Sequence, residues 1–217
     1  MHQANLAQRH VLPARDRALD ILSAPMRAQT WRATAFNLAS LPIGLVTATA
    51  VTVGLSLGVA LLPVLVGLPV LLGVLAASRW FAGAELRRLH WLDGRIRRPA
   101  PSQPRPEWTW PAVRARLADP TSWRSAAYAV IAGPLGIVTF TIATASWAYA
   151  AAAATEPFWN GDGGSGRLLG FVAERPVDHL AITCAGLVAF FVAPWLNRGA
   201  ARAHAALADH LLPTRHR

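Results

Sequence analysis

Residues 31–48 read WRATAFNLASLPIGLVTA, and residues 123–140 read WRSAAYAVIAGPLGIVTF. Both stretches open with a Trp-Arg pair, continue as an apolar run, and carry a Pro-x-Gly step near the middle. Neither stretch contains a charged residue after its arginine. An apolar stretch of this length suggests a membrane-spanning helix, and its second occurrence suggests an internal repeat.

Charged residues are scarce and unevenly spread along the 217-residue chain. They make up 15% of it, against about 25% in soluble domains. Three segments lack Asp, Glu, Lys and Arg altogether: residues 33–78, 125–155 and 179–197. A helix needs about 20 mostly apolar residues to cross a bilayer, so the first segment is long enough for two crossings and the others for one each. The sequence therefore predicts four transmembrane helices, because a soluble bundle does not explain an uncharged run of this length.

We place the helices at about 33–54, 58–83, 121–152 and from about 178 onward, the last continuing past Arg198. Gly54 and Gly58 flank a serine at the midpoint of the first uncharged segment. Small residues favour a tight turn, so the turn between the first two helices is expected there. Asp119 followed by Pro120 is typical of an N-cap and first helical position, and it predicts the start of the third helix.

Arginine decides the orientation, because the chain has no lysine and all 21 of its basic residues are Arg. Arginines concentrate before the first helix, between the second and third, and after the fourth, whereas acidic residues predominate between the third and fourth. The positive-inside rule then predicts a multi-pass plasma-membrane protein with cytoplasmic termini and residues 153–178 outside. This topology and anionic lipid head groups account for the net charge of +10, so no nucleic-acid binding is expected.

Aligned over 22 residues from Trp31 and Trp123, the two copies match through specific residues, namely Trp, Arg, Pro, Gly and three threonines, and not through Ala and Leu alone. The ends of the second and fourth helices echo each other more weakly, with Arg79 against Arg198 and Leu92 against Leu211. Each copy crosses twice, so both enter the membrane in the same direction, unlike the inverted repeats of many transporters. The predicted fold class is all-α, an integral membrane four-helix module built from two parallel two-helix repeats.

The Trp-Arg pairs stand where the cytoplasmic membrane interface is expected. Trp is enriched at that interface, and Arg reaches the head groups while its stem stays in the apolar layer. We interpret four residues as anchors of the repeats: Trp31, Arg32, Trp123 and Arg124.

The Pro-x-Gly steps place Pro42 and Gly44 in the first helix and Pro134 and Gly136 in the third. A proline inside a helix removes one hydrogen bond and permits a kink, and a glycine allows another helix to approach closely. These four residues are candidate hinges of a movable core. Duplication of a packing motif explains them as well, and that interpretation is favoured.

The chain divides into a cytoplasmic N-terminal segment (1–30), a first hairpin with a cytoplasmic extension (31–98), a Pro-rich linker (99–118) and a second hairpin (119–213). The second hairpin includes the outer loop and its own cytoplasmic extension. Within the linker, Trp108 and Trp110 are expected at the membrane interface, and Pro111–Leu117 is expected to form a short amphipathic helix.

A basic cluster follows the second helix. It is a candidate surface for anionic lipid or for a docking partner, with lipid the preferred interpretation. Its members are Arg87, Arg88, Arg95, Arg97 and Arg98.

Residue patterns typical of catalysis or metal binding are sparse. The single cysteine, Cys184, is expected to be a buried structural thiol. No pair among the seven histidines has ligand spacing with a carboxylate at membrane depth. Asn37 is interpreted as an interhelical hydrogen-bonding residue. No charged side chain is expected in the middle of a helix, which argues against an ion-coupled transporter. No catalytic, cofactor-binding or metal-binding residue is predicted, and no cofactor.

Four stretches carry a resemblance to a known family: APMRAQTWRATAFNLASLPIG, GLSLGVALLPVLVGLPVLL, LADPTSWRSAAYAVIAGPLGIVTF and APWLNRGAARAHAALADHLL. They resemble the sensor-domain family of actinobacterial membrane proteins, a four-helix module often placed before a histidine kinase and also found alone. The resemblance covers about residues 23–213, and Asp119 to Arg124 is its most specific part. It implies a membrane protein of signal transduction and two-component systems, and it transfers no ligand-binding residue.

The kinase members of that family continue into a phosphoacceptor helix and an ATP-binding domain, whereas this chain ends at Arg217. His90 follows GAELRRL but is succeeded by Trp91 instead of an acidic residue, so autokinase activity is not expected. The function predicted is a non-catalytic membrane sensor or signalling accessory. Its expected partners are the bilayer, a histidine kinase or another regulator, and a second copy of the chain. The alternatives are a small transporter or permease subunit, and a membrane scaffold.

Overall fold

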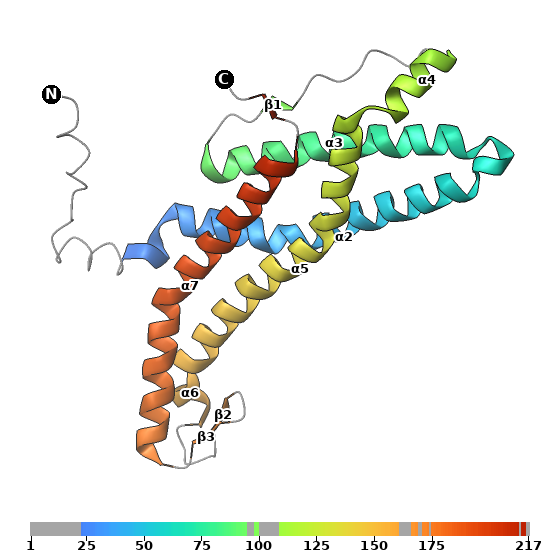
Figure 1. The fold of residues 1–217 in the computed structure, drawn as a ribbon. Helices are drawn as coiled ribbons and strands as arrows, with labels where there is room; N and C mark the ends of the chain where they lie inside the picture. Colours follow the sequence, from blue (N-terminus) through green and yellow to red (C-terminus); the bar gives the residue numbers. More distant parts are fainter. Residues whose placement is uncertain are drawn as a thin grey trace, which may run out of the picture. The chain divides into compact units, whose positions relative to one another are not determined.

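Four long helices dominate the computed structural model, which describes residues 23–94, 98–99, 109–160, 166–168, 171–173, 175–212 and 214–215 (Figure 1). The long helices are α2 (Ala28–Ala60), α3 (Gly67–Asp93), α5 (Pro120–Ala154) and α7 (Pro176–Leu211). Each is long and apolar enough to cross a membrane. The all-α fold with four candidate membrane spans is therefore confirmed.

Short elements complete the described chain. The predicted helix in the linker is present as α4 (Trp110–Leu117), and a second short helix, α6 (Glu156–Asn160), follows α5. A 3-10 turn, η1 (Ala24–Met26), precedes α2. Two antiparallel strand pairs occur, β1 (Arg98–Pro99) with β4 (Thr214–Arg215), and β2 (Gly166–Leu168) with β3 (Phe171–Ala173). Trp108 lies outside the described residues.

The turn between α2 and α3 is not where the glycines predicted it. α2 continues to Ala60, and the reversal is made by the 3-10 turn η2 (Leu62–Val64), followed by Leu65 with a φ of 60°. Gly54 and Gly58 instead face α3, where an added Cβ would meet the side chains of Val74 and Leu71. Glycine occupies these two positions because α3 packs closely against them, and not because the chain turns there.

The second hairpin agrees more closely with the sequence. α5 covers the predicted 121–152, and α7 begins near residue 178 and continues past Arg198 as one unbroken helix. Pro42, Pro134 and Pro194 all lie inside α2, α5 and α7 without ending them. The boundaries of these helices follow local signals, such as the Asp119-Pro120 start, which explains why they could be predicted.

The described residues divide into two compact units: those within Met1–Thr30 and Ser146–Trp195, and those within Trp31–Ala145 and Leu196–Arg217. The first unit has a small core of Ala153 and Ile182 with Tyr149 packed against it. A Cβ at Gly186 would collide with the backbone of Ala153 and Ala154, so the two helix segments of this unit approach to backbone contact. His179 Nδ1 lies 2.6 Å from Glu156 Oε1 in the same unit.

The second unit contains the larger core, and alanine dominates it. Phe36, Leu86 and Leu89 are its largest fully buried apolar side chains. The alanines in this core let helices approach closely, which is how helices associate where apolar burial from water gives no driving force. They are Ala33, Ala82, Ala132, Ala201, Ala205 and Ala208.

The closest approach in the second unit is between α2 and α5. A Cβ at Gly44 would collide with the carbonyl oxygen of Ala132, and a Cβ at Gly136 would collide with the carbonyl oxygen of Ser40. In the alignment of the two copies, Ser40 stands against Ala132 and Gly44 against Gly136. The two contacts are therefore equivalent under the alignment. The glycine of each helix lies against the same aligned position of the other helix.

Replacing Gly136 with alanine should separate α2 from α5. The added methyl group has no room against the Ser40 carbonyl, and the neighbour that must move is backbone. We expect a loss of about 1–3 kcal/mol, the usual cost of overpacking, seen as a lower thermal midpoint of the detergent-solubilised protein by circular dichroism. Gly199→Ala is the matched control, because no atom lies within 4 Å of the added Cβ and alanine is the better helix former. Equal midpoints for the two variants would contradict the crossing.

Candidate functional site

The candidate hinge residues divide into two pairs. Gly44 and Gly136 are buried at the crossing of α2 and α5, whereas Pro42 and Pro134 are exposed on the same two helices. The structure thus gives the glycines a packing role, and both prolines lie on helix faces turned away from the core. A hinge motion at these four residues stays a prediction.

The repeat anchors are exposed at the starts of α2 and α5, and the second pair makes specific bonds. The indole Nε1 of Trp123 donates to the Leu117 carbonyl at 2.7 Å, which ties α5 to the end of α4. Arg124 donates to the His210 carbonyl at 2.7 Å, near the end of α7. Trp31 and Arg32 are exposed on α2, as expected of interfacial residues.

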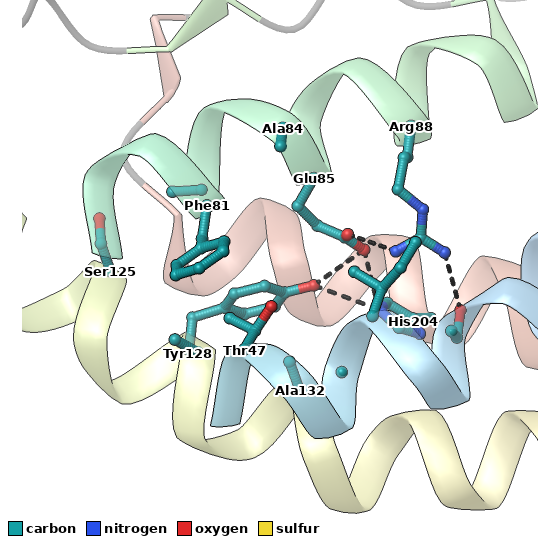
Figure 2. Close-up of a pocket in the computed structure, with 14 residues that line it drawn as sticks. Thr47, Phe81, Ala84, Glu85, Arg88, Ser125, Tyr128, Ala132 and His204 are labelled. Carbon is teal, nitrogen blue, oxygen red and sulfur yellow. Dashed lines mark hydrogen bonds and ion pairs between the residues drawn. The ribbon is translucent and has the colours of Figure 1, made fainter. Parts of the chain in front are cut away.

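A buried polar cluster lies beside the α2–α5 crossing, and Glu85 on α3 is its centre. One carboxylate oxygen of Glu85 lies 2.6 Å from Nη1 of Arg88, and the other accepts a hydrogen bond from the Tyr128 hydroxyl at 3.3 Å. That second oxygen also lies 3.2 Å from Nε2 of His204. Figure 2 shows these side chains converging from α3, α5 and α7. Three helices therefore meet through one carboxylate.

Arg88 connects this cluster to the remaining long helix, α2. Its Nη2 donates to the Ser40 hydroxyl at 3.1 Å and to the Phe36 carbonyl at 3.3 Å. The guanidinium carbon also lies 4.7 Å from the centroid of the Phe36 ring. An ion pair is tolerated in an apolar interior only while its hydrogen bonds are maintained, because a buried charge that loses its partner is strongly destabilising.

His204 completes the network from α7. Its Nε2 lies 3.1 Å from the Tyr128 hydroxyl, and its ring packs edge-on against Phe36 with centroids 5.1 Å apart. With a proton on Nε2, the ring donates and the Tyr128 hydroxyl can donate to Glu85, so both bonds are satisfied. Nδ1 of His204 is buried and has no hydrogen-bond partner among the described residues.

A small cavity of about 40 Å³ borders the cluster and is lined by Thr47, Phe81 and Ser125 as well as by Glu85, Tyr128 and His204 (Figure 2). A buried water needs roughly 10–15 Å³ of such space and two to four polar partners. The cavity therefore has the size and the polar lining for one or a few water molecules, and it is too small for an organic ligand.

Sequence reasoning did not identify this cluster. It expected no charged side chain in the middle of a helix and placed Glu85 and Arg198 in extensions of the second and fourth helices. The structure instead buries both residues inside α3 and α7. Both helices run on unbroken beyond their expected apolar spans, so residues assigned to polar extensions lie inside the packed unit. One signal was available: the register that aligns Arg79 with Arg198 also aligns Glu85 with His204.

Asn37 fits its predicted role. Its amide nitrogen donates to the backbone carbonyl of Asn197 at 3.0 Å and to the Asn197 side-chain oxygen at 3.2 Å, which joins α2 to α7. Cys184 does not fit, since its side chain is exposed. The position lies on a candidate membrane span, where an exposed apolar thiol can face lipid at no cost.

A second charged contact lies at the start of α5. Arg79 Nη1 is 3.0 Å from Asp119 Oδ2, and the two oxygens of Asp119 accept hydrogen bonds from the Thr121 and Ser122 amides at 3.1 Å. The Ser122 hydroxyl donates as well, at 2.6 Å. Burial by itself raises the pKa of Asp119, but the hydrogen bonds from Ser122 and Thr121 outweigh it and hold that pKa below its ordinary value. The predicted N-cap is confirmed and also joins α3 to α5.

The predicted basic cluster is not gathered on one described surface. Arg88 belongs to the buried network, and Arg87 is exposed on α3. Arg95 and Arg97 lie outside the described residues, as does the side chain of Arg98. Among the described residues, no group of three or more His, Cys, Asp or Glu side chains is placed to hold a metal ion.

A comparison with protein families found one match. A family profile described as "Putative sensor" matches residues 36–212. The curated proteins and the solved structures gave no match to this chain. The matched range contains all four side chains of the buried cluster and most of α2, so the family profile covers the arrangement described above.

Replacing Glu85 with alanine should strongly destabilise the protein. Arg88, Tyr128 and His204 would lose their shared acceptor, and removing one partner of a buried ion pair costs about 3–5 kcal/mol. Tyr128→Phe removes one hydroxyl and should cost about 1 kcal/mol. Thermal midpoints in detergent should therefore fall in the order wild type, Tyr128→Phe, Glu85→Ala. Arg202→Gln changes an exposed arginine on α7 and is the control; a Glu85→Ala midpoint equal to that of this control would contradict the network.

Asp119 should contribute pH-dependent stability. Because its pKa in the folded state is lowered, its contribution is complete above the ordinary carboxyl pKa of about 4 and is lost as the pH falls through the folded value. Asp119→Ala removes the cap and should cost about 1 kcal/mol or more at pH 7, whereas Asp119→Asn keeps a capping oxygen and should cost less. Thermal midpoints between pH 7 and pH 3 measure this: the gap between wild type and Asp119→Asn should narrow on acidification. A gap that stays constant would contradict the assignment.

Proposed function

Because the chain belongs to the sensor family whose profile covers residues 36–212, we propose that it is a non-catalytic membrane sensor. In this proposal it relays a membrane or extracellular stimulus to a cytoplasmic or membrane partner, which we infer to be a histidine kinase or another regulator. The orientation with both termini in the cytoplasm is part of the proposal and rests on the distribution of arginine.

One observation carries the proposal: a single buried carboxylate connects all the long helices of the second unit. Glu85 bonds directly to residues of α5 and α7, and Arg88 extends the connection to α2. Packed interiors and ion pairs switch between discrete arrangements instead of deforming continuously. A stimulus that moves one helix must therefore either leave the network intact or rearrange it as a unit, and the second case is a signal.

The equivalent glycine contacts support a further part of the proposal, an internal two-fold relation between the two hairpins. Gly44 and Gly136 exchange partners under the alignment, as described above. Phe36 aligns with Tyr128 and Glu85 with His204. The Phe36 ring packs against His204, and the Tyr128 hydroxyl bonds to Glu85, so each aromatic residue contacts an ionisable residue of the other hairpin. In this proposal, a displacement of one hairpin would change the contacts at the equivalent positions of the other hairpin.

The output would leave through the ends of α3 and α7. Both helices run on beyond the cluster, to Asp93 and Leu211, and short strands after them pair with each other. A rigid helix transmits a shift or rotation along its length, so a change at Glu85 or His204 reaches these ends without a separate device.

A small transporter or permease subunit is the second candidate. Its support is that Glu85 and His204 are ionisable groups buried within candidate membrane spans, and such groups commonly mark ion pathways. We expected no charged side chain in the middle of a helix, and Glu85 and His204 lie nearer the C-terminal ends of α3 and α7 than their middles. Proton or substrate flux through protein reconstituted in vesicles, lost in Glu85→Gln, would favour this candidate over a sensor.

In-cell crosslinking followed by mass spectrometry tests the sensor proposal. We expect tagged wild-type protein to capture a histidine kinase or another identified regulator, and joint substitution of Arg95, Arg97 and Arg98 by glutamine to reduce that capture at equal expression. Glu85→Gln should change the yield of the same partner, and Arg202→Gln should not. Recovery of only the chain itself, or of transport ATPases, would overturn the sensor proposal.

A further inference from the structure

A groove of about 510 Å³ runs between α2 and α3 on the surface of the second unit. Ala35 and Ala39 of α2 and Ala84 of α3 line it together with Phe36, and Arg87, Arg88 and Trp91 line its α3 side. We propose that this groove binds one anionic phospholipid, with the phosphate at Arg87 and an acyl chain along the alanines. This inference deepens the proposed function and rests on it for the signalling consequence alone.

The shape of the groove fits an acyl chain. Ala35 and Ala39 stand one helical turn apart on α2, and with Ala84 opposite them the two helices leave an open, apolar channel. Both helices are candidate membrane spans, so lipid is the solvent around this groove. A chain lying there gains dispersion contacts with three small side chains that do not fill the space themselves.

The charge of the groove fits a phosphate. Arg87 is exposed, and its guanidinium has no hydrogen bond or ion pair with another described residue. Trp91 lies one turn further along α3 on the same side and is exposed, as is typical of an anchor at head-group depth. Arginine binds phosphate oxygens through paired N–H donors, so an exposed arginine beside an indole at this depth favours an anionic head group.

Arg88 connects the groove to the buried cluster. It lines the groove and donates to Glu85 at 2.6 Å, with its side chain only partly exposed. A phosphate at Arg87 brings negative charge close to Arg88, where it competes with the Glu85 carboxylate for the guanidinium. Lipid occupancy would therefore bias the network that joins α3 to α5 and α7, which makes the lipid the stimulus.

One site per chain is expected. In the register that aligns Glu85 with His204, Arg87 and Arg88 stand against Ala206 and Leu207 of α7. The corresponding positions of the second hairpin therefore carry neither positive charge, and anionic lipid has no electrostatic reason to bind there.

Native mass spectrometry of the full chain in detergent, titrated with phosphatidylglycerol, tests the proposal. We expect one tightly bound phosphatidylglycerol per chain and weaker binding of phosphatidylcholine with the same acyl chains. Arg87→Gln should weaken the binding about fivefold, the effect of removing about one arginine's attraction to an anionic lipid, and Arg87→Lys should restore most of it. Ala84→Leu fills the groove without changing charge and should weaken binding as well.

Controls separate this site from general charge and from free phosphate. Arg202→Gln removes one exposed arginine from α7 and should leave binding unchanged, and each variant is first checked for helical content and a single size-exclusion peak. The proposal is overturned if phosphatidylcholine binds equally, if Arg202→Gln weakens binding as much as Arg87→Gln, or if Ala84→Leu binds like wild type. Competition by millimolar inorganic phosphate would equally overturn it, since the groove would then recognise the free ion.

The outcome is independent of the sensor assay. Lipid binding with no captured regulator would leave the groove assigned and reject the signalling role. Capture of a regulator by a chain that binds no phosphatidylglycerol would reject the groove and leave the sensor proposal in place.

Discussion

Backbone contact between α2 and α5 is the constraint on which the rest of the second unit depends. Gly44 and Gly136 let each helix press against a carbonyl of the other, at Ala132 and Ser40. Two helices that meet at this distance leave little freedom for the side chains around the crossing. Phe36 of α2 packs against His204 of α7 and Arg88 of α3, and Tyr128 of α5 bonds to Glu85 of α3.

That placement explains how a charged network exists in an alanine-rich interior. Glu85 is buried, and a buried carboxylate is tolerated only when donors surround it. Arg88, Tyr128 and His204 supply those donors from three helices. The crossing of α2 and α5 positions two of them, because Ser40 of α2 holds Arg88 and Tyr128 itself lies on α5. In the sensor that we propose, stability and the response to a stimulus would come from the same contacts, since breaking one bond unbalances the others.

The arrangement also relates the membrane to the interior. Arg88 is shared between the buried network and the groove that we propose for an anionic lipid, and Arg87 beside it is exposed. A membrane sensor needs a surface that the bilayer can act on and an interior that responds to it. Neighbouring residues on α3 provide both within one helical turn, with no separate sensory domain among the described residues.

The sequence by itself determined the all-α class, the number of long apolar helices, the start of α5 at Asp119 and the extent of α7, because hydropathy and capping are local properties of the chain. Tertiary structure alone decided where α2 ends, since Gly54 and Gly58 serve packing against α3 and look the same in sequence as turn residues. It alone brought together Glu85, Tyr128 and His204, whose pairing depends on which helix faces meet at the crossing. No local pattern encodes that meeting, and for that reason the polar cluster was not predicted.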